Sequence, residues 1–167
     1  MSCRDARERC AWPRVVLLAA ICCLIAPPLF DPASCAAQTA PAPGVAAPAG
    51  VVREVEAGLA QAVQRFEARD VAGVLALVSE QYRTGPLTKA GIREQLLTTY
   101  ALYDSVKATV RIDEVRMVGE HAWVYSTGEV SGRLRLLGTP MVFLSWEREL
   151  EVVRREGGAW RLFGYQQ

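Results

Sequence analysis

The chain has 167 residues, of which 51% are hydrophobic, and 19 basic residues stand against 18 acidic ones, for a net charge of +1. This balance, without a basic stripe, argues against a nucleic-acid-binding protein. All five cysteines lie in the first 35 residues and there is a single histidine, so the rest of the chain offers no group of side chains suited to a metal. The glycine-rich fingerprints of nucleotide-binding proteins are absent as well. We therefore expect no nucleic acid, no metal and no cofactor.

Residues 1–37 have the layout of a secretory signal peptide. Four arginines precede an apolar run at 15–25, and Cys35 and Ala37 place small side chains at the −3 and −1 positions of a cut before Gln38. The run is shorter than the roughly 20 apolar residues that span a bilayer. A membrane anchor, lipidation of Cys35 and a cut one residue earlier stay open as alternatives. The prediction is a periplasmic or secreted protein that meets a membrane only through an uncleaved leader.

Residues 38–50 are rich in Ala, Pro and Gly, a composition that buries little apolar surface. We expect this segment to be a linker. The remaining span, 51–167, has the size of one domain. It contains no cysteine, so its core alone must hold it together.

Apolar residues at helical spacing predict three helices in the first half of this domain. The apolar face of the first helix is formed by Val52, Val55, Leu59, Val63 and Phe66. That helix ends near Arg69, and Asp70 is placed to cap a second, shorter helix. Thr88 is placed to cap the third, whose apolar face is formed by Ile92, Leu96, Tyr100 and Tyr103.

From Val106 onward apolar and polar residues alternate, which is typical of strands with one wet face. A turn at Gly157-Gly158 joins two such runs and predicts a hairpin. The longer run places one row of apolar side chains on a single face: Val142, Leu144, Trp146, Leu150 and Val152. Arg148 interrupts this row. The predicted fold class is α+β, with three N-terminal helices packed in a curved antiparallel sheet.

Three stretches carry a resemblance to a known family. They are residues 66–70 at the end of the first helix, the Gly-Glu-His-Ala opening of a strand at Gly119, and the ending 148–163 with its Gly-Gly-Ala-Trp turn. In this order they resemble the nuclear transport factor 2-like, or SnoaL-like, superfamily. The resemblance implies a cystatin-like cone with a pocket between sheet and helices, and frequent dimers through the outer face of the sheet. It implies no single activity, because members include isomerases, cyclases, dehydratases and proteins with no known reaction.

Arg148 is the leading candidate for a binding residue. A guanidinium in an apolar row must find a partner or a water-filled space. We interpret it as the polar spot of the pocket, where it would hold a carboxylate or another anionic group of a ligand. The alternatives are a buried structural ion pair with a nearby glutamate, or a bulge that sends it to solvent. The other predicted ligand-binding residues are aromatic, with core packing as their alternative: Trp146, Tyr82, Tyr100 and Tyr103.

The sequence does not assign a catalytic residue. Isomerase-type members of this fold use a carboxylate base with a tyrosine–acid pair, which requires an acid on the inner face. Asp104, Asp113 and Glu129 are the candidates, and none can be placed there from the pattern. His121, the single histidine, lies beside a turn, where it is a poor base for a hydroxyl nucleophile.

Trp123 and Tyr125 fall on the face opposite the small residues of their strand, where bare aromatic rings would be unfavourable. We expect them to form a homodimer contact, with cover by the chain's own tether as the alternative. The function predicted is an exported, cofactor-free domain that binds a small molecule. The alternative is a cofactor-free isomerase, cyclase or dehydratase that uses a carboxylate and a tyrosine, and a third possibility is a purely structural or partner-docking module.

Overall fold

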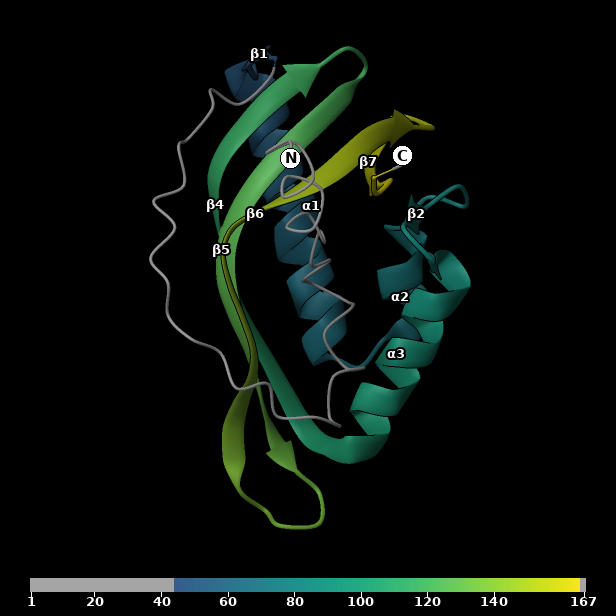
Figure 1. Cartoon of the computed structure of the whole chain (residues 1–167), viewed down its shortest axis with the longest axis vertical. Coiled ribbons are helices and arrows are strands. Elements are labelled where there is room, and N and C mark those ends of the chain that lie inside the picture. Colours follow the sequence, from purple (N-terminus) through teal and green to yellow (C-terminus); the bar gives the residue numbers. More distant parts are fainter. Residues whose placement is uncertain (1–43, 166–167) are drawn as a thin grey trace, which may run out of the picture.

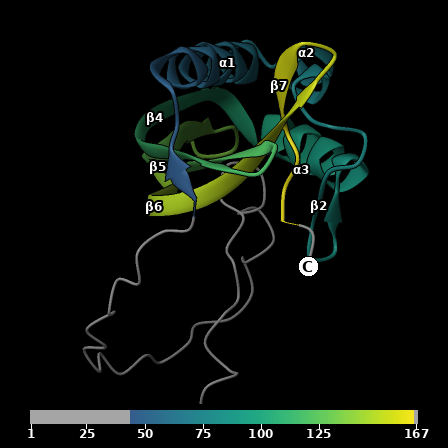
Figure 2. The ribbon, with the colours of Figure 1, turned by 90° about the horizontal axis from the view of Figure 1, so that it is seen from above.

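The computed structural model describes residues 44–165, in which a five-stranded antiparallel sheet curves around helix α1 (Figure 1, Figure 2). The order of strands in the sheet is β1-β4-β5-β6-β7. These strands are β1 (Val45–Ala46), β4 (Tyr103–Val118), β5 (His121–Leu134), β6 (Pro140–Glu156) and β7 (Ala159–Leu162). A separate ribbon pairs β2 (Arg83–Thr84) with β3 (Leu87–Thr88). The predicted α+β class with a curved antiparallel sheet is confirmed.

Helices occupy the predicted segments as α1 (Ala49–Glu67), α2 (Val71–Ala76) and α3 (Lys89–Leu102). Asp70 caps α2, since its Oδ1 accepts a hydrogen bond from the N–H of Gly73 at 2.8 Å. Thr88 caps α3 in the same way, through its Oγ1 and the N–H of Gly91 at 3.4 Å. Tyr103 does not extend α3. It adopts an extended backbone and begins β4.

Helix α1 lies on the concave side of the sheet, and α2 and α3 lie beside it (Figure 1). α1 packs on β4 and α2, and α2 packs on α3. The core beneath α2 and α3 is centred on Ile92 and Leu96, which are fully buried. A second core joins α1 to the sheet through Val55, Val115 and Val124. No helix within residues 44–165 is long and apolar enough to cross a membrane.

The N-terminal boundary of the domain differs from the prediction. Val45 and Ala46 pair with β4 as strand β1, and α1 begins at Ala49, so the last part of the predicted linker 38–50 belongs to the fold. Strand β1 is held by backbone hydrogen bonds and leaves its side chains exposed, so no apolar pattern marks it. The predicted signal peptide and the rest of the linker lie outside the described residues.

Two bulges lie side by side in the sheet. Asp113 is an extra residue in β4, between the pairs formed by Ile112 and Glu114 with β5. On β6 two residues, Glu147 and Arg148, lie opposite Thr127 alone. Thr127 joins the two bulges, because its Oγ1 donates to Asp113 Oδ2 at 2.5 Å and accepts from the N–H of Arg148 at 3.0 Å. Bulges bend the strands that carry them and reverse the faces of the residues that follow.

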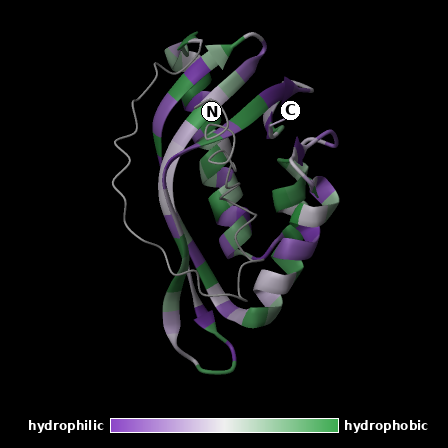
Figure 3. Cartoon of the chain, viewed as in Figure 1, coloured by the Kyte–Doolittle hydropathy of each residue, from purple (hydrophilic) through white to green (hydrophobic). Residues whose placement is uncertain are grey.

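The β5–β6 hairpin, residues 131–143, extends beyond the rest of the domain, and its tip is coloured as hydrophobic in Figure 3. Leu136 and Leu137 at this tip are 91% and 73% exposed. An exposed apolar turn of this kind is unusual on a soluble domain.

Candidate functional site

A cavity of about 130 Å³ lies between α1 and the inner face of the sheet. Helix α1 lines it with Val55, Gly58, Leu59, Ala62, Val63 and Phe66. The sheet lines it with apolar side chains from β4, β5, β6 and β7 and with a few polar ones. The polar residues of the lining are Ser126, Glu149 and Glu151.

Trp146 forms part of the wall and is fixed by two features of β5. Its Nε1 donates a buried hydrogen bond to Ser126 Oγ at 3.1 Å. Its ring lies against Gly128, where an added Cβ would come within 2.6 Å of the ring. The small residues of β5 therefore make room for the indole. Trp146 is part of the lining, and its predicted role in ligand binding stays a prediction.

Glu149 and Glu151 are the carboxylates of the cavity wall, and the sequence pattern had placed their face outward. The bulge at Arg148 explains the difference. Before the bulge Trp146 pairs with Gly128; after it Glu149 pairs with Ser126 and Glu151 pairs with Val124. Cross-strand partners share a face, so the two glutamates point inward with Ser126 and Val124. Leu150 and Val152, expected inside, are turned to the other face.

Arg148 does not line the cavity, so its predicted place at the polar spot of the pocket is corrected. Its φ of 46° marks the bulge, and its side chain is half exposed. Its Nη2 forms an ion pair with Glu114 Oε2 at 2.5 Å, and its guanidinium lies 5.1 Å from the ring centroid of Tyr125. Hydrogen bonds from Arg116 and Arg148 hold the pKa of Glu114 below its usual value. The bulge considered as an alternative for Arg148 is present, and an ion pair forms as well, but it is half exposed and not the buried pair that was considered.

Tyr82, Tyr100 and Tyr103 are buried in the core under α2 and α3 and are not part of the cavity lining. Tyr100 Oη donates to the backbone oxygen of Phe66 at 2.9 Å, and burial raises the pKa of Tyr100 to about 12. Tyr103 stacks on Phe143 at 4.3 Å between ring centroids. Their packing separates these rings from the site, and their predicted role in ligand binding stays untested.

Two buried or partly buried tyrosines, Tyr82 and Tyr165, feel the charge of Glu151 in the cavity wall. The hydroxyl of Tyr82 is buried without a well-formed hydrogen bond among the described residues. Burial raises the pKa of Tyr82 first, and the nearby charge of Glu151 raises it further. Burial also raises the pKa of Tyr165, to about 12, and the charges of Tyr125 and Glu151 add smaller increases.

The acids weighed in the sequence lie elsewhere. Glu129 is exposed. Asp104 pairs with Arg135 at 3.3 Å, and Asp113 pairs with Arg111 at 2.9 Å within its bulge. None of the three lines the cavity. His121 packs beside Phe163 at 5.1 Å, and no group of three or more potential metal ligands occurs within residues 44–165.

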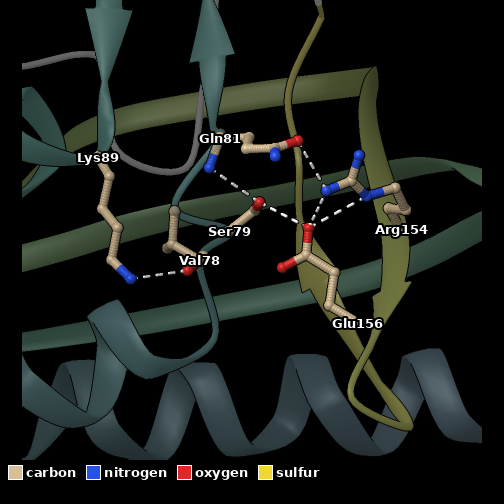
Figure 4. A network of polar contacts seen from close by, with 6 residues as sticks. All are labelled: Val78, Ser79, Gln81, Lys89, Arg154 and Glu156. Atoms are coloured by element: carbon tan, nitrogen blue, oxygen red, sulfur yellow. Dashed lines mark hydrogen bonds and ion pairs between the residues drawn. The ribbon is translucent and has the colours of Figure 1, made fainter.

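A polar network lies next to Val78, which is part of the cavity lining (Figure 4). Ser79 Oγ donates to Glu156 Oε1 at 2.7 Å, and Arg154 also binds this carboxylate. Arg154 Nη2 further donates to Gln81 Oε1 at 3.0 Å. The hydrogen bond from Ser79 and the charge of Arg154 lower the pKa of Glu156.

This network holds the segment after α2 against the last hairpin. Val78 and Leu162, which both line the cavity, form a parallel bridge there. The N–H of Ser79 donates to Leu162 O at 2.8 Å. Because Ser79 and Glu156 are far apart in the chain, no sequence pattern pointed to this contact.

On the outer face, Trp123 and Tyr125 are half buried within the domain. The ring of Tyr165 meets the edge of Trp123 at 5.6 Å, and Arg148 lies over Tyr125. The homodimer contact expected at these two rings stays a prediction.

No protein-family model matches this chain, and no curated protein matches it. Solved structures do match. A candidate scytalone dehydratase from Novosphingobium aromaticivorans aligns over 69% of this chain and 80% of its own, with 13% identity and a TM-score of 0.59. A ketosteroid isomerase-like protein from Erwinia carotovora atroseptica aligns over 67% and 90%, with 19% identity and a TM-score of 0.53. A candidate dehydratase of the nuclear transport factor 2-like family from Streptomyces avermitilis aligns over 70% and 94%, with 14% identity and a TM-score of 0.57.

The chain therefore has the fold of the nuclear transport factor 2-like, or SnoaL-like, superfamily, as the resemblance predicted. At these identities the likeness concerns the fold, and it assigns no substrate and no reaction to this chain.

Proposed function

We propose that this exported domain binds a small, largely apolar molecule in the cavity under α1, without a cofactor. The observation that carries the proposal is the cavity itself, whose walls are apolar apart from a few polar groups on β5 and β6. Its volume of about 130 Å³ is close to that of an engineered cavity of about 150 Å³ that takes up benzene. The enclosed part of the ligand is therefore about the size of one six-membered ring.

The polar end of this ligand is a hydrogen-bond donor. Glu149 and Glu151 are the acidic residues of the wall, and carboxyl oxygens there would accept a hydrogen bond from a ligand and repel an anionic one. A hydroxyl or an amine fits this wall, and a carboxylate does not. The anionic ligand that Arg148 suggested is replaced by a ligand of the opposite polarity.

Three single-ring compounds test the proposed ligand size and the proposed donor end: benzylamine, benzyl alcohol and benzoate. Binding is measured by isothermal titration calorimetry. We expect benzylamine and benzyl alcohol to bind and benzoate to bind at least about tenfold more weakly, which corresponds to about 1.4 kcal/mol. Tightest binding by benzoate would refute the assignment of the donor end.

Ala62→Leu fills the cavity from α1, and Ala60→Leu places the same side chain on the exposed face of the same helix. The first variant should abolish binding of all three compounds and the second should leave it unchanged. Equal binding by both variants would place the site outside this cavity. Glu149→Gln and Glu151→Gln should each reduce the difference in affinity between benzylamine and benzoate. Benzyl alcohol should still bind to both variants.

A second candidate function is acid–base catalysis of the isomerase, cyclase or dehydratase type. The observation that favours it is Glu151 in the cavity lining, whose charge acts on the buried hydroxyl of Tyr82 behind the wall. A carboxylate at an apolar wall can remove a proton next to a carbonyl, and a tyrosine can donate to the oxyanion that forms. Cyclohexanone fits the cavity by size and carries such protons.

The assay is exchange of these protons for deuterium, followed by proton nuclear magnetic resonance in D₂O. An enzyme would accelerate exchange over buffer, and Glu149→Gln or Glu151→Gln would remove the acceleration. If cyclohexanone binds but its protons exchange no faster than in buffer, this catalytic function is rejected. The binding function would then stand.

A further inference from the structure

The tip of the β5–β6 hairpin is the most exposed apolar feature of the described domain. Leu136 and Leu137 form the apex, and Met141 and Val142 on the returning strand are 44% and 52% exposed. Leu102 at the end of α3 is 38% exposed and its backbone oxygen accepts from the N–H of Arg135, so it lies beside the tip. The hairpin extends from the end of the molecule opposite β1 (Figure 1).

The charged residues on the hairpin itself have one sign. Between Glu129 and Glu147 the charged residues of the sequence are two arginines, Arg133 and Arg135. Arg133 is exposed on β5, where its backbone pairs with the neighbouring strands. Arg135 pairs with Asp104 and donates to Tyr100 O, but its side chain is still 50% exposed. The hairpin therefore has an apolar apex with arginines at its base.

We propose that this hairpin tip docks on an anionic lipid bilayer, with Leu136 and Leu137 inserted and the arginines at the lipid phosphates. The spacing suits this arrangement. Arg133 lies on β5, and Leu136 lies in the turn that follows the end of this strand at Leu134, so the arginine lies behind the apex. Amphipathic protein segments at a bilayer surface bury their apolar side chains about 5–10 Å deep, which leaves Arg133 at the headgroups.

A bilayer fits the tip better than a protein partner does. The tip is a narrow protrusion, with its apolar side chains at the end and no acid on the hairpin (Figure 3). Guanidinium groups bind phosphate in a forked geometry, and anionic lipids supply phosphate at the required depth. This contact is made by the folded domain itself, in addition to any contact through an uncleaved leader.

The test uses the full chain with vesicles of phosphatidylcholine containing phosphatidylglycerol, and with vesicles of phosphatidylcholine alone. Amide hydrogen exchange is measured by mass spectrometry on the peptide 134–141. This local readout separates the tip from the leader, because a leader bound to lipid does not protect the hairpin amides. Protection of this peptide by the anionic vesicles, and weaker protection by the neutral ones, supports the proposal.

Matched variants complete the test. Leu136→Ser with Leu137→Ser should weaken vesicle binding through the tip more than about tenfold, because the apolar area that would enter the lipid is lost. Arg133→Gln should weaken it about fivefold, the effect of one arginine at an anionic surface. Val45→Ser is the control, since Val45 is 67% exposed on β1 at the other end of the molecule, and it should change nothing.

Two outcomes would overturn the proposal. One is an exchange rate of the peptide 134–141 that anionic vesicles do not alter. The other is protection of this peptide that grows with protein concentration in the absence of vesicles, which would assign the tip to a contact between copies of the chain.

Discussion

Thr127→Val tests the double bulge that shapes the candidate site. The substitution keeps the volume of the side chain and removes the hydroxyl that bridges Asp113 and Arg148. The side chain of Asp113 is 13% exposed, so water replaces the lost donor poorly. A hydrogen bond to a charged group contributes about 1.5–3 kcal/mol, whereas the N–H of the exposed Arg148 regains water at little cost, so we expect a loss of about 2–3 kcal/mol.

The assay is urea unfolding at pH 7, followed by tryptophan fluorescence. Thr109→Val is the matched control, because Thr109 is exposed on β4, and it should change the free energy of unfolding by less than about 0.5 kcal/mol. If Thr127→Val is no more destabilising than Thr109→Val, the two bulges are not tied by this hydroxyl. A second readout is the preference for benzylamine over benzoate, which should fall with the loss of register at Glu149 and Glu151.

Two further predictions concern the walls of the cavity. Gly128→Ala should destabilise the domain by about 1–3 kcal/mol in urea unfolding, because the new Cβ would lie 2.5 Å from the backbone oxygen of Thr109 and 2.6 Å from the Trp146 ring; stability equal to the wild type would show that the indole does not rest on this glycine. Because the pKa of Glu156 is lowered in the folded state, its contribution to stability is present above the unfolded pKa of about 4.3 and is lost as the pH falls through the folded pKa. Glu156→Gln should therefore lose less stability between pH 7 and pH 3 than the wild type does, measured by urea unfolding at both pH values; the same loss in both proteins would contradict this.

Local features of the fold were predicted correctly because their causes lie within a few residues. A capping side chain needs only the N–H groups of the next turn, and both Asp70 and Thr88 have them. The Gly157-Gly158 turn requires positive φ at both residues, and their φ values are 59° and 85°. Where neighbours in the chain decide the structure, the residue types alone predict it.

Contacts between segments far apart in the chain could not be predicted. Strand β1 joins the sheet through backbone hydrogen bonds of Val45 and Ala46, and its composition is that of a linker. The Ser79–Glu156 contact depends on two segments brought together by the complete sheet. The same holds for Tyr82, Tyr100 and Tyr103, because an apolar pattern cannot distinguish a ring that packs in the core from one that faces a cavity.

The carboxylates of the cavity were missed for a different reason. The alternation of faces along β6 holds only while the register is unbroken, and one extra residue reverses it. The signal was present in the sequence, because a charged Arg148 within an apolar row is what a bulge produces. Counting the row through the bulge instead of restarting it after Arg148 placed Leu150 and Val152 in the cavity.

One extra residue in β6 therefore sets the polarity of the candidate site. With unbroken pairing beyond Trp146 and Gly128, Arg148 would lie opposite Ser126 and the cavity would hold a cation between apolar walls. The bulge moves this cation to the outer face, where it meets Glu114, and brings Glu149 to Ser126 in its place. Thr127 on β5 hydrogen-bonds both the bulge of β4 at Asp113 and the bulge of β6 at Arg148. The ligand polarity and the curvature of the sheet therefore depend on the same few hydrogen bonds.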